Sequence, residues 1–190
     1  MERSYTEDKT FNNGNYNEEQ LPTGDYESCR FINCEFLKSD LTAISFIDCV
    51  FENCNLSMAS LAKTVLRDVK FANCKMLGIH FENCNQFGLA VNFESCNLSH
   101  SSFYHAKLKK TIFKNSNLQE VDFTDSDISY SVFEKCDLAN ATFENTMMDK
   151  ADFRSAFNYS IDPEINRIKK ARFSLAGVKG LLGKYEIDID

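Results

Sequence analysis

Residues 29–36 read CRFINCEF, and the pattern returns 20 residues later as CVFENCNL. In both stretches the cysteines lie five residues apart, and a large apolar residue stands two positions after each of them. The same five-residue step joins large apolar residues from Phe31 to Phe81 and, after a gap of 12 residues, from Phe93 to Phe153. The position two before each large residue is small, and all eight cysteines fall at this small position of the register.

A period of five fits neither an α-helix, with 3.6 residues per turn, nor a flat strand, with a period of two. It fits a backbone that turns a corner every five residues and sends one large and one small side chain inward. Four corners close a square coil of 20 residues. This step, lengthened by two residues across the gap, aligns one column of phenylalanines: Phe11, Phe31, Phe51, Phe71, Phe93, Phe113, Phe133, Phe153 and Phe173.

The alignment predicts an all-β solenoid over residues 9–173. An insertion of two residues forms a bulge within residues 84–92, and residues 1–8 form an N-terminal tail or cap. Residues 154–172 make a last coil without a net insertion, because Phe173 keeps the 20-residue step although the five-residue pattern there has decayed.

The cysteines are predicted to be small buried side chains that pack beside bulky neighbours. Ser, Ala, Thr and Val take equivalent positions, so the site requires small size rather than a thiol. The alternative is a string of metal ligands or redox thiols, but the three histidines form no closely paired ligand set with the cysteines. We therefore expect no metal, no cofactor and no catalytic residue. The chain shows neither a secretory segment nor an apolar run of membrane-spanning length, so we expect a cytoplasmic protein with reduced thiols and no membrane partner.

A second column contains asparagines two residues after the phenylalanines, at Asn13, Asn33, Asn53, Asn73 and Asn115. This is a corner position, where Asn tolerates the dihedral angles of a turn. Stacked amide side chains can also hydrogen-bond from coil to coil. We expect these asparagines to be structural.

These features resemble the pentapeptide-repeat family, whose members fold as a right-handed quadrilateral β-helix, and the resemblance covers about residues 9–156. CNLSMASL (54–61) and KMLGIHFENC (75–84) are similar to stretches of the Qnr quinolone-resistance proteins, and IDPEINRI (161–168) is similar to the microcin immunity proteins of the same group. The resemblance implies a non-enzymatic, DNA-mimic-like homodimer that binds DNA gyrase or topoisomerase IV and protects it from quinolones or a peptide toxin. The alternative function is a solenoid scaffold for an unrelated protein partner.

The chain departs from that group at its interruption. The Qnr proteins of Gram-negative bacteria carry projecting loops that matter for protection, whereas here CNQFGLAVN (84–92) adds only two residues. Within this bulge, Gln86, Phe87 and Leu89 are the candidate partner-binding residues.

Residues 174–190 are predicted to form a short helix and then a strand. Ser174 is a candidate helix N-cap, and Tyr185 begins an alternation of apolar and acidic residues. The end of a solenoid exposes apolar core and must be covered, so this segment is either a cap or a two-fold dimer interface. The candidate dimerisation residues are Leu175, Val178, Leu181, Leu182, Tyr185 and Ile187.

The charge pattern narrows the choice of partner. A net charge of −7 without a dominant basic face argues against direct nucleic-acid binding. The densest acidic run is QEVDFTDSD (119–127), and it supplies the candidate partner-binding patch Glu120, Asp122, Asp125 and Asp127. The alternative for this run is an ordinary solvated face.

Overall fold

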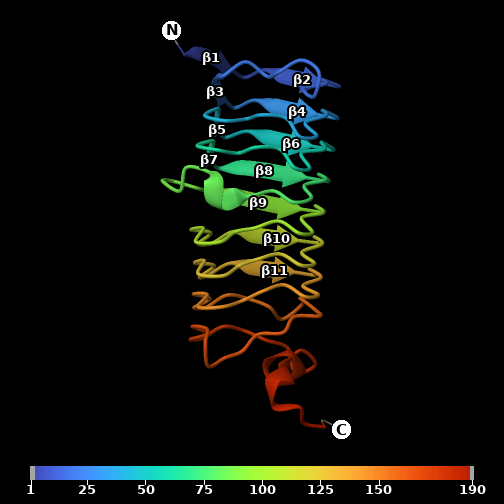
Figure 1. Ribbon diagram of the computed structural model, residues 1–190, viewed down its shortest axis with the longest axis vertical. Coiled ribbons are helices and arrows are strands. Elements are labelled where there is room, and N and C mark those ends of the chain that lie inside the picture. The colour runs from blue at the N-terminus through green and yellow to red at the C-terminus, as the bar shows by residue number, and fades with distance from the viewer. Residues whose placement is uncertain (1–2, 189–190) are drawn as a thin grey trace.

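The computed structural model describes residues 3–188, which form one rod of stacked coils (Figure 1). Parallel strands stack along two sides of the rod. The larger sheet contains β2 (Thr10–Asn12), β4 (Arg30–Ile32), β6 (Val50–Glu52), β8 (Val69–Ala72), β9 (Val91–Glu94), β10 (Ile112–Lys114) and β11 (Val132–Glu134). The smaller sheet contains β1 (Ser4–Glu7), β3 (Gly24–Glu27), β5 (Ser45–Ile47) and β7 (Val65–Arg67). Isolated parallel bridges such as Asn97 to Asn117 continue the stacking elsewhere. The predicted all-β quadrilateral β-helix is confirmed.

The coil at residues 111–130 defines the four sides of the rod. Phe113, Leu118, Phe123 and Ile128 point inward and are fully buried, one from each group of five residues. We name these groups and the residues stacked on them sides 1 to 4, in that order. Side 1 carries the larger sheet and side 4 the smaller one.

The strand register confirms the insertion of two residues. Phe51 pairs with Phe71 at the ordinary spacing of 20 residues, whereas Phe71 pairs with Phe93. The short 3-10 helix η1 (Phe81–Asn83) precedes the extra residues. The bulge therefore lies on side 4, between coils whose register is otherwise unbroken.

The phenylalanine column predicted from the sequence forms a continuous stack. Phe113 lies between Phe93 and Phe133, with ring centroids 5.1 and 4.8 Å away and nearly parallel planes. Phe103 and Phe123 on side 3 meet it edge to face. Offset stacking and edge-to-face contacts are the favoured aromatic geometries, so the interior satisfies both packing and ring electrostatics.

The cysteines are all buried and free, and every thiol except that of Cys84 forms a hydrogen bond within residues 3–188. The thiol of Cys54 donates to the carbonyl oxygens of Phe31 and Glu52, and its sulfur accepts a bond from the backbone N–H of Cys34. Ser116 makes the same kind of contact, since its hydroxyl accepts from the N–H of Cys96. The small inward residue thus links one coil to the next, a role that its size alone did not predict.

The corners explain the asparagine column in part. Asn33, Asn53 and Asn115 have positive φ angles of 54°, 54° and 49°, as expected at a corner. No hydrogen bond joins the side chains of this column among residues 3–188, so the expected amide ladder is absent there. The side chains that support the turns precede the inward residue instead: Asn117 Oδ1, for example, accepts the backbone N–H of Gln119 at 2.9 Å.

The two ends of the rod differ from the predicted boundaries. Strand β1 pairs in parallel with β3, so the ladder already begins within residues 1–8. At the other end the predicted helix is a pair of 3-10 turns, η2 (Val178–Leu181) and η3 (Gly183–Tyr185). Residues 186–188 do not form the predicted strand, and the rest of that alternation lies outside the described residues. No helix within the described chain is long and apolar enough to cross a membrane.

Candidate partner-binding surfaces

The acidic run at residues 119–127 is divided between sides of the rod. Asp122 and Asp125 lie on side 3, and Glu120 lies at the corner before it. Asp127 lies on side 4, where its backbone forms an isolated parallel β-bridge with that of Lys107. The side chain of Glu120 is 54% exposed and that of Asp125 is 31% exposed, but that of Asp127 is only 9% exposed. The structure therefore removes Asp127 from the expected patch.

Asp127 already has partners within the chain. Its carboxylate accepts the backbone N–H of Ser129 at 3.1 Å and lies 3.0 Å from Lys109 Nζ. Burial alone would raise the pKa of Asp127, but the hydrogen bonds from Ser129 and Lys109 bring it below its ordinary value. Replacing Asp127 would break a turn and an ion pair, so it is unsuitable as a probe of a surface.

Side 3 carries a broader acidic surface than the linear run shows. The stacked segments HFEN (80–83), SFYH (102–105), DFTD (122–125) and TFEN (142–145) contain no Lys or Arg. We call the carboxylates of this surface the acidic face: Glu82, Glu120, Asp122, Asp125 and Glu144. The 20-residue columns could have revealed it from the sequence, since they bring Glu82 and Glu144 to the side of Asp122.

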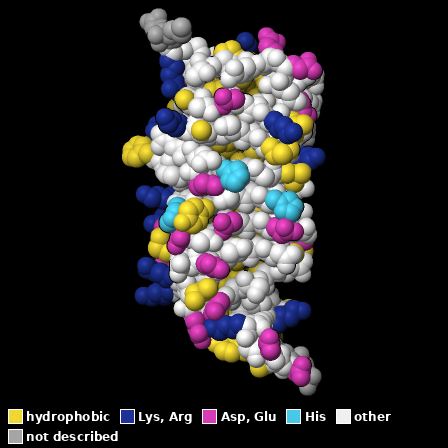
Figure 2. Space-filling model, in the orientation of Figure 1, with side chains coloured by type: hydrophobic (Ala, Val, Ile, Leu, Met, Phe, Trp, Pro, Cys, Tyr) yellow, Lys and Arg dark blue, Asp and Glu magenta, His cyan; other side chains and the backbone are white. Residues whose placement is uncertain are grey.

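The three histidines lie against the acidic face. His80 Nδ1 is 2.8 Å from Glu82, His100 Nδ1 is 3.1 Å from Glu120, and His105 Nε2 is 3.8 Å from Asp125. Figure 2 shows the histidines and several acidic side chains together on the face turned to the viewer. The histidine side chains are 61–62% exposed.

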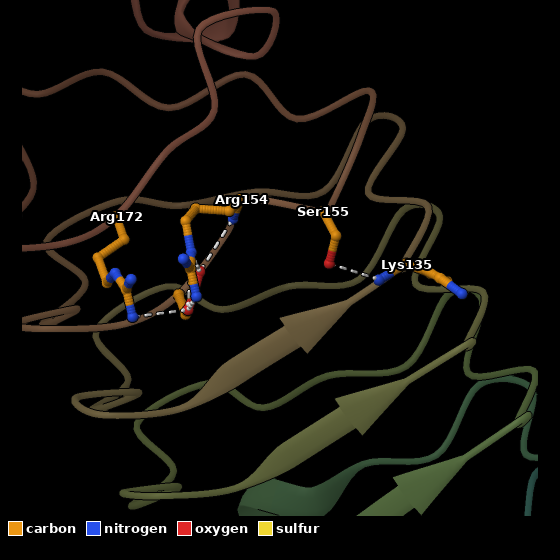
Figure 3. Close-up of polar contacts among 5 residues, drawn as sticks. Lys135, Arg154, Ser155 and Arg172 are labelled. Atoms are coloured by element: carbon orange, nitrogen blue, oxygen red, sulfur yellow. Dashed lines mark hydrogen bonds and ion pairs between the residues drawn. The ribbon is translucent and has the colours of Figure 1, made fainter.

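Side 1, in contrast, neutralises its own charges. Lys114 Nζ lies 2.8 Å from Glu94. Figure 3 shows Arg154 and Arg172 converging on one carboxylate, that of Asp152, at 2.7 and 3.3 Å. Nearby, the hydroxyl of Ser155 accepts the backbone N–H of Lys135. This side offers a partner little unpaired charge and is a natural control surface.

The bulge presents one of its three candidate residues. Gln86 uses its side chain internally: Nε2 donates to the carbonyls of Phe81 and Cys84, and Oε1 accepts the N–H of Lys107. Leu89 packs against the core. Phe87 is 79% exposed, with the Arg67 guanidinium 5.7 Å from its ring centroid. Phe87 is therefore the residue of the bulge that a partner can reach.

The candidate dimerisation residues divide into exposed and packed ones. Leu175 is 93% exposed, and Ile187, Tyr185 and Val178 are 56%, 49% and 37% exposed. Leu181 packs against the core, and Leu182 is half-buried. The end of the rod thus presents an apolar surface, which is a feature of association sites.

Two of the three glycines of this segment, Gly177 and Gly180, pack against Tyr159, whereas Gly183 lies at the start of η3 and does not touch it. A methyl group at Gly177 would overlap the Tyr159 hydroxyl, and one at Gly180 would overlap the Tyr159 carbonyl oxygen. Ser174 Oγ accepts the N–H of Gly177 at 3.1 Å, but the N-cap of η2 is Gly177, so Ser174 caps the preceding turn and not the helix as expected. Glycine at positions 177 and 180 permits this close packing.

Polar contacts fasten the segment to the last coil. Lys184 Nζ lies 2.7 Å from Asp162 and 2.6 Å from Glu164, and the Tyr185 hydroxyl donates to Glu164 at 2.8 Å. Asn166, at a small inward position, accepts the N–H of Thr146. IDPEINRI (161–168) therefore completes the last coil and holds the C-terminal segment on it.

Two of the buried thiols are held in the protonated form. Burial raises the pKa of Cys84 and of Cys136 to about 12, so both thiols stay protonated at neutral pH. Within residues 3–188 no three His, Cys, Asp or Glu side chains are placed to hold a metal ion.

Comparison with known proteins identifies the repeat. The family described as "Pentapeptide repeat region" matches residues 25–89 and 80–153, more than half of the chain. A search among curated proteins found no match. Among solved structures, full-length QnrB1, described as a plasmid-mediated fluoroquinolone resistance protein, is 14% identical, with a TM-score of 0.53 over 97% of this chain and 100% of that one. A trypsin-treated variant of QnrB1 is 17% identical, with a TM-score of 0.51 over 99% and 98%. Likeness at these identities shows a shared fold.

Proposed function

The chain belongs to the pentapeptide-repeat family, and we propose that it is a non-enzymatic, DNA-mimic-like protein that binds DNA gyrase or topoisomerase IV. The observation that carries the proposal is a rod that aligns along its whole length with QnrB1, a fluoroquinolone resistance protein. Protection of the topoisomerase from quinolones or a peptide toxin is the proposed consequence. We place this encounter in the cytoplasm, where the free thiols would stay reduced.

The dimensions favour mimicry of shape over mimicry of total charge. The phenylalanine column spans eight steps of about 4.8 Å, or roughly 38 Å, and two rods end to end span roughly 75–80 Å. Duplex DNA of that length carries about 45 negative charges, at one per ~1.7 Å. Two copies of the chain carry twice −7, or −14, so charge mimicry has to be local.

The acidic face is the best candidate for that local contact. It lacks Lys and Arg, and histidines are its neighbours rather than fixed cations. Carboxylates on such a face attract a basic groove over a Debye length of about 8 Å at physiological salt, so binding should weaken as salt is raised.

Reversal of three exposed carboxylates tests the acidic face. We expect the triple variant Glu120→Lys, Asp125→Lys and Glu144→Lys to lose topoisomerase binding at least about tenfold, or ~1.4 kcal/mol. Asp122 is left intact because it accepts the backbone N–H of Thr124 at 2.8 Å. Glu120 and Asp125 are corner residues with positive φ, and lysine suits them because Lys110 and Lys150 already occupy corners with positive φ.

The matched control reverses three carboxylates on side 1: Glu52→Lys, Glu94→Lys and Glu134→Lys. It makes the same change in net charge on a side where two of the three carboxylates, Glu52 and Glu94, already pair with Arg30 and Lys114, so it should weaken binding much less. Both variants should melt near the wild-type temperature. The readouts are pull-down of the topoisomerase at low and high salt, and supercoiling by gyrase with and without ciprofloxacin.

Wild-type protein that neither binds nor alters supercoiling at low salt would overturn the proposal and favour a scaffold for an unrelated protein. Equal loss in both triple variants would discard the acidic face as the contact. Phe87→Ala then tests the bulge, where loss of binding would assign the contact to Phe87.

We also propose that the chain forms a homodimer through its C-terminal segment. The exposed side chains of Leu175 and Val178 support this. Leu175→Asp with Val178→Asp should give a monomer in sedimentation at micromolar concentration. Ile112→Asp, at an equally apolar position on side 1 that is 46% exposed, should leave the dimer intact. Wild-type protein that sediments as a monomer would overturn this interface.

A further inference from the structure

The bulge divides side 4 into two halves of opposite charge. Its N-terminal half-face carries six acidic residues, Glu7, Asp8, Asp25, Glu27, Asp48 and Asp68, and one basic residue, Arg67. Its C-terminal half-face carries seven basic residues, Lys107, Lys109, Lys110, Lys150, Arg167, Lys169 and Lys170, and two acidic ones, Asp127 and Asp149. In Figure 2 the basic side chains follow one edge of the rod through its lower half. One continuous surface is therefore acidic before the bulge and basic after it.

Only some of these charges are paired within the chain. Arg3 pairs with Asp25 at 2.7 Å, and Arg167 pairs with Asp149 at 2.8 Å. Within residues 3–188 no ion pair forms at Glu7, Asp8, Asp48, Asp68, Lys107, Lys110, Lys169 or Lys170. Like charges stacked on adjacent coils repel each other, so each half-face gains from an opposite charge brought to it.

We infer that side 4 associates with side 4 of a second copy of this chain, with the two rods antiparallel. The corner column of side 4 reads Asp8, Ser28, Asp48, Asp68, the bulge, Lys110, Tyr130, Lys150 and Lys170. Equal numbers of coils lie on either side of the bulge. A two-fold axis through the bulge and parallel to the strands therefore brings corner to corner: Asp8 faces Lys170 of the second copy, and Asp68 faces its Lys110.

The same operation brings Glu7 opposite Lys169 of the second copy, but also Glu27 opposite its Asp149 and Arg67 opposite its Lys109, so the attraction comes from the opposite net charges of the two half-faces. A parallel arrangement of the rods would set acid against acid and base against base, which electrostatic complementarity disfavours. A two-fold axis makes the contact self-complementary and closed, so each charged pair occurs twice and no unpaired half-face is left over.

Phe87 supplies an apolar centre for this contact. It projects from the bulge with 79% of its surface exposed, and the axis brings the two Phe87 rings together. An apolar centre surrounded by a charged rim is the common anatomy of protein interfaces. A polyanionic ligand would explain the C-terminal half-face but would leave the acidic one without a partner. The contact is separate from the acidic face and the C-terminal segment, so it goes beyond the proposed function.

Zero-length cross-linking with a carbodiimide tests the arrangement on the full chain. Asp8 and Lys170 are separated by eight coils, roughly 38 Å, within one molecule, so a bond between them can form only between two copies. We expect a covalent dimer at low salt whose linked peptides join residues 7–8 to residues 169–170. When the reaction is carried out in 0.5 M salt, this cross-linked dimer should not form. An apolar dimer contact through the C-terminal segment should, in contrast, survive that salt concentration.

Charge reversal supplies the control and the rescue. Glu7→Lys with Asp8→Lys should reduce this dimer by about tenfold, and so should Lys169→Glu with Lys170→Glu. All four substitutions in one chain restore opposite charges across the axis and should restore the dimer, which also shows that the variants fold. The inference is overturned if no such link forms in the wild type, or if the fourfold variant behaves like the two double variants.

Discussion

The coils and the C-terminal segment protect apolar surface in different ways. Each inward residue of a coil meets nearly the same neighbours one coil above and below, as Phe113 does between Phe93 and Phe133. The C-terminal segment depends on one fit, in which glycines pack against Tyr159. Repetition spreads stability over many equivalent contacts, whereas the end of the rod relies on a few that occur once.

The largest expected effect lies inside the coils. Phe113→Ala removes a fully buried ring from the middle of the stack and leaves a cavity that neighbouring coils cannot close. We expect a loss of about 3–5 kcal/mol in the free energy of unfolding, measured by chemical denaturation.

Phe11→Ala is the matched control at the end of the same column. Phe11 is only partly buried and stacks on one neighbour, Phe31, at 4.8 Å. The loss should be roughly 1–2 kcal/mol, because less apolar area is removed from the core. Equal losses at Phe11 and Phe113 would contradict a stack whose strength depends on neighbours on both faces.

The coils could be predicted from the sequence because every position returns to the same environment after 20 residues. The alignment of the phenylalanine column predicted which residues point inward, where the two inserted residues lie, and that residues 154–172 form a last coil. The hydrogen bonds of the small inward residues did not follow, since the same positions accept Cys, Ser and Ala. Burial of Asp127 was missed because the acidic residues were grouped along the chain instead of by side.

The end of the rod could be predicted only in outline. Leu175, Val178 and Leu181 have helical spacing, which indicated a helix but not its type. The position of the segment depends on packing against Tyr159, which lies in a coil where the five-residue pattern has decayed. A contact that occurs only once produces no repeating pattern in the sequence, so it could not be predicted from periodicity.

The second prediction tests that single fit. Gly180→Ala would push a methyl group into the Tyr159 carbonyl and to within 2.8 Å of its ring, and it would disturb the bond from the Ile161 N–H to the Gly180 carbonyl. We expect docking of residues 174–188 to weaken by about 1–3 kcal/mol, seen as faster hydrogen exchange there while the coils stay protected.

Gly183→Ala is the control for this change, since its methyl group would meet only Ser160 Oγ at 3.8 Å. It should leave exchange in the C-terminal segment close to wild type. If the two alanine variants exchange alike, the glycines do not act through contact with Tyr159.

The third prediction concerns the thiols of the coils. Cys74 Sγ donates to the carbonyls of Phe51 and Ala72, and Ser116 shows that a hydroxyl can serve at an equivalent position. Cys74→Ser should therefore cost less than Cys74→Ala, which loses the donor and about 0.5–1.5 kcal/mol. Chelators and reductants should leave the melting temperature unchanged. Unfolding by either reagent would mean that the thiols hold a metal or form disulfides.

The smallest expected effect is at Asp152, where the last coils meet on side 1. The hydrogen bond from the Arg154 side chain lowers the pKa of Asp152, and Arg172 adds to the effect. Because the folded-state pKa is depressed, this pair stabilises the fold above the unfolded pKa of about 3.9 and ceases to do so as pH falls through the folded value. Asp152→Asn keeps an oxygen for the N–H of Arg154 but removes the charge. Both arginine side chains are more than half exposed, so the variant should lose only about 0.2–1 kcal/mol at pH 7.

That difference should shrink as the pH falls from about 4 towards the depressed pKa of Asp152, because wild-type Asp152 is progressively protonated there. Denaturation at pH 7 and pH 3 measures it, and 0.5 M salt at pH 7 should reduce it in the same direction. Glu134→Gln, on the same side but without an ion pair among the described residues, should show neither dependence. If Asp152→Asn loses as much stability relative to wild type at pH 3 as at pH 7, the role of Asp152 lies in its turn geometry and not in its charge. The last coil would then depend on one specific contact, as the C-terminal segment does, rather than on the repeated contacts of the coils before it.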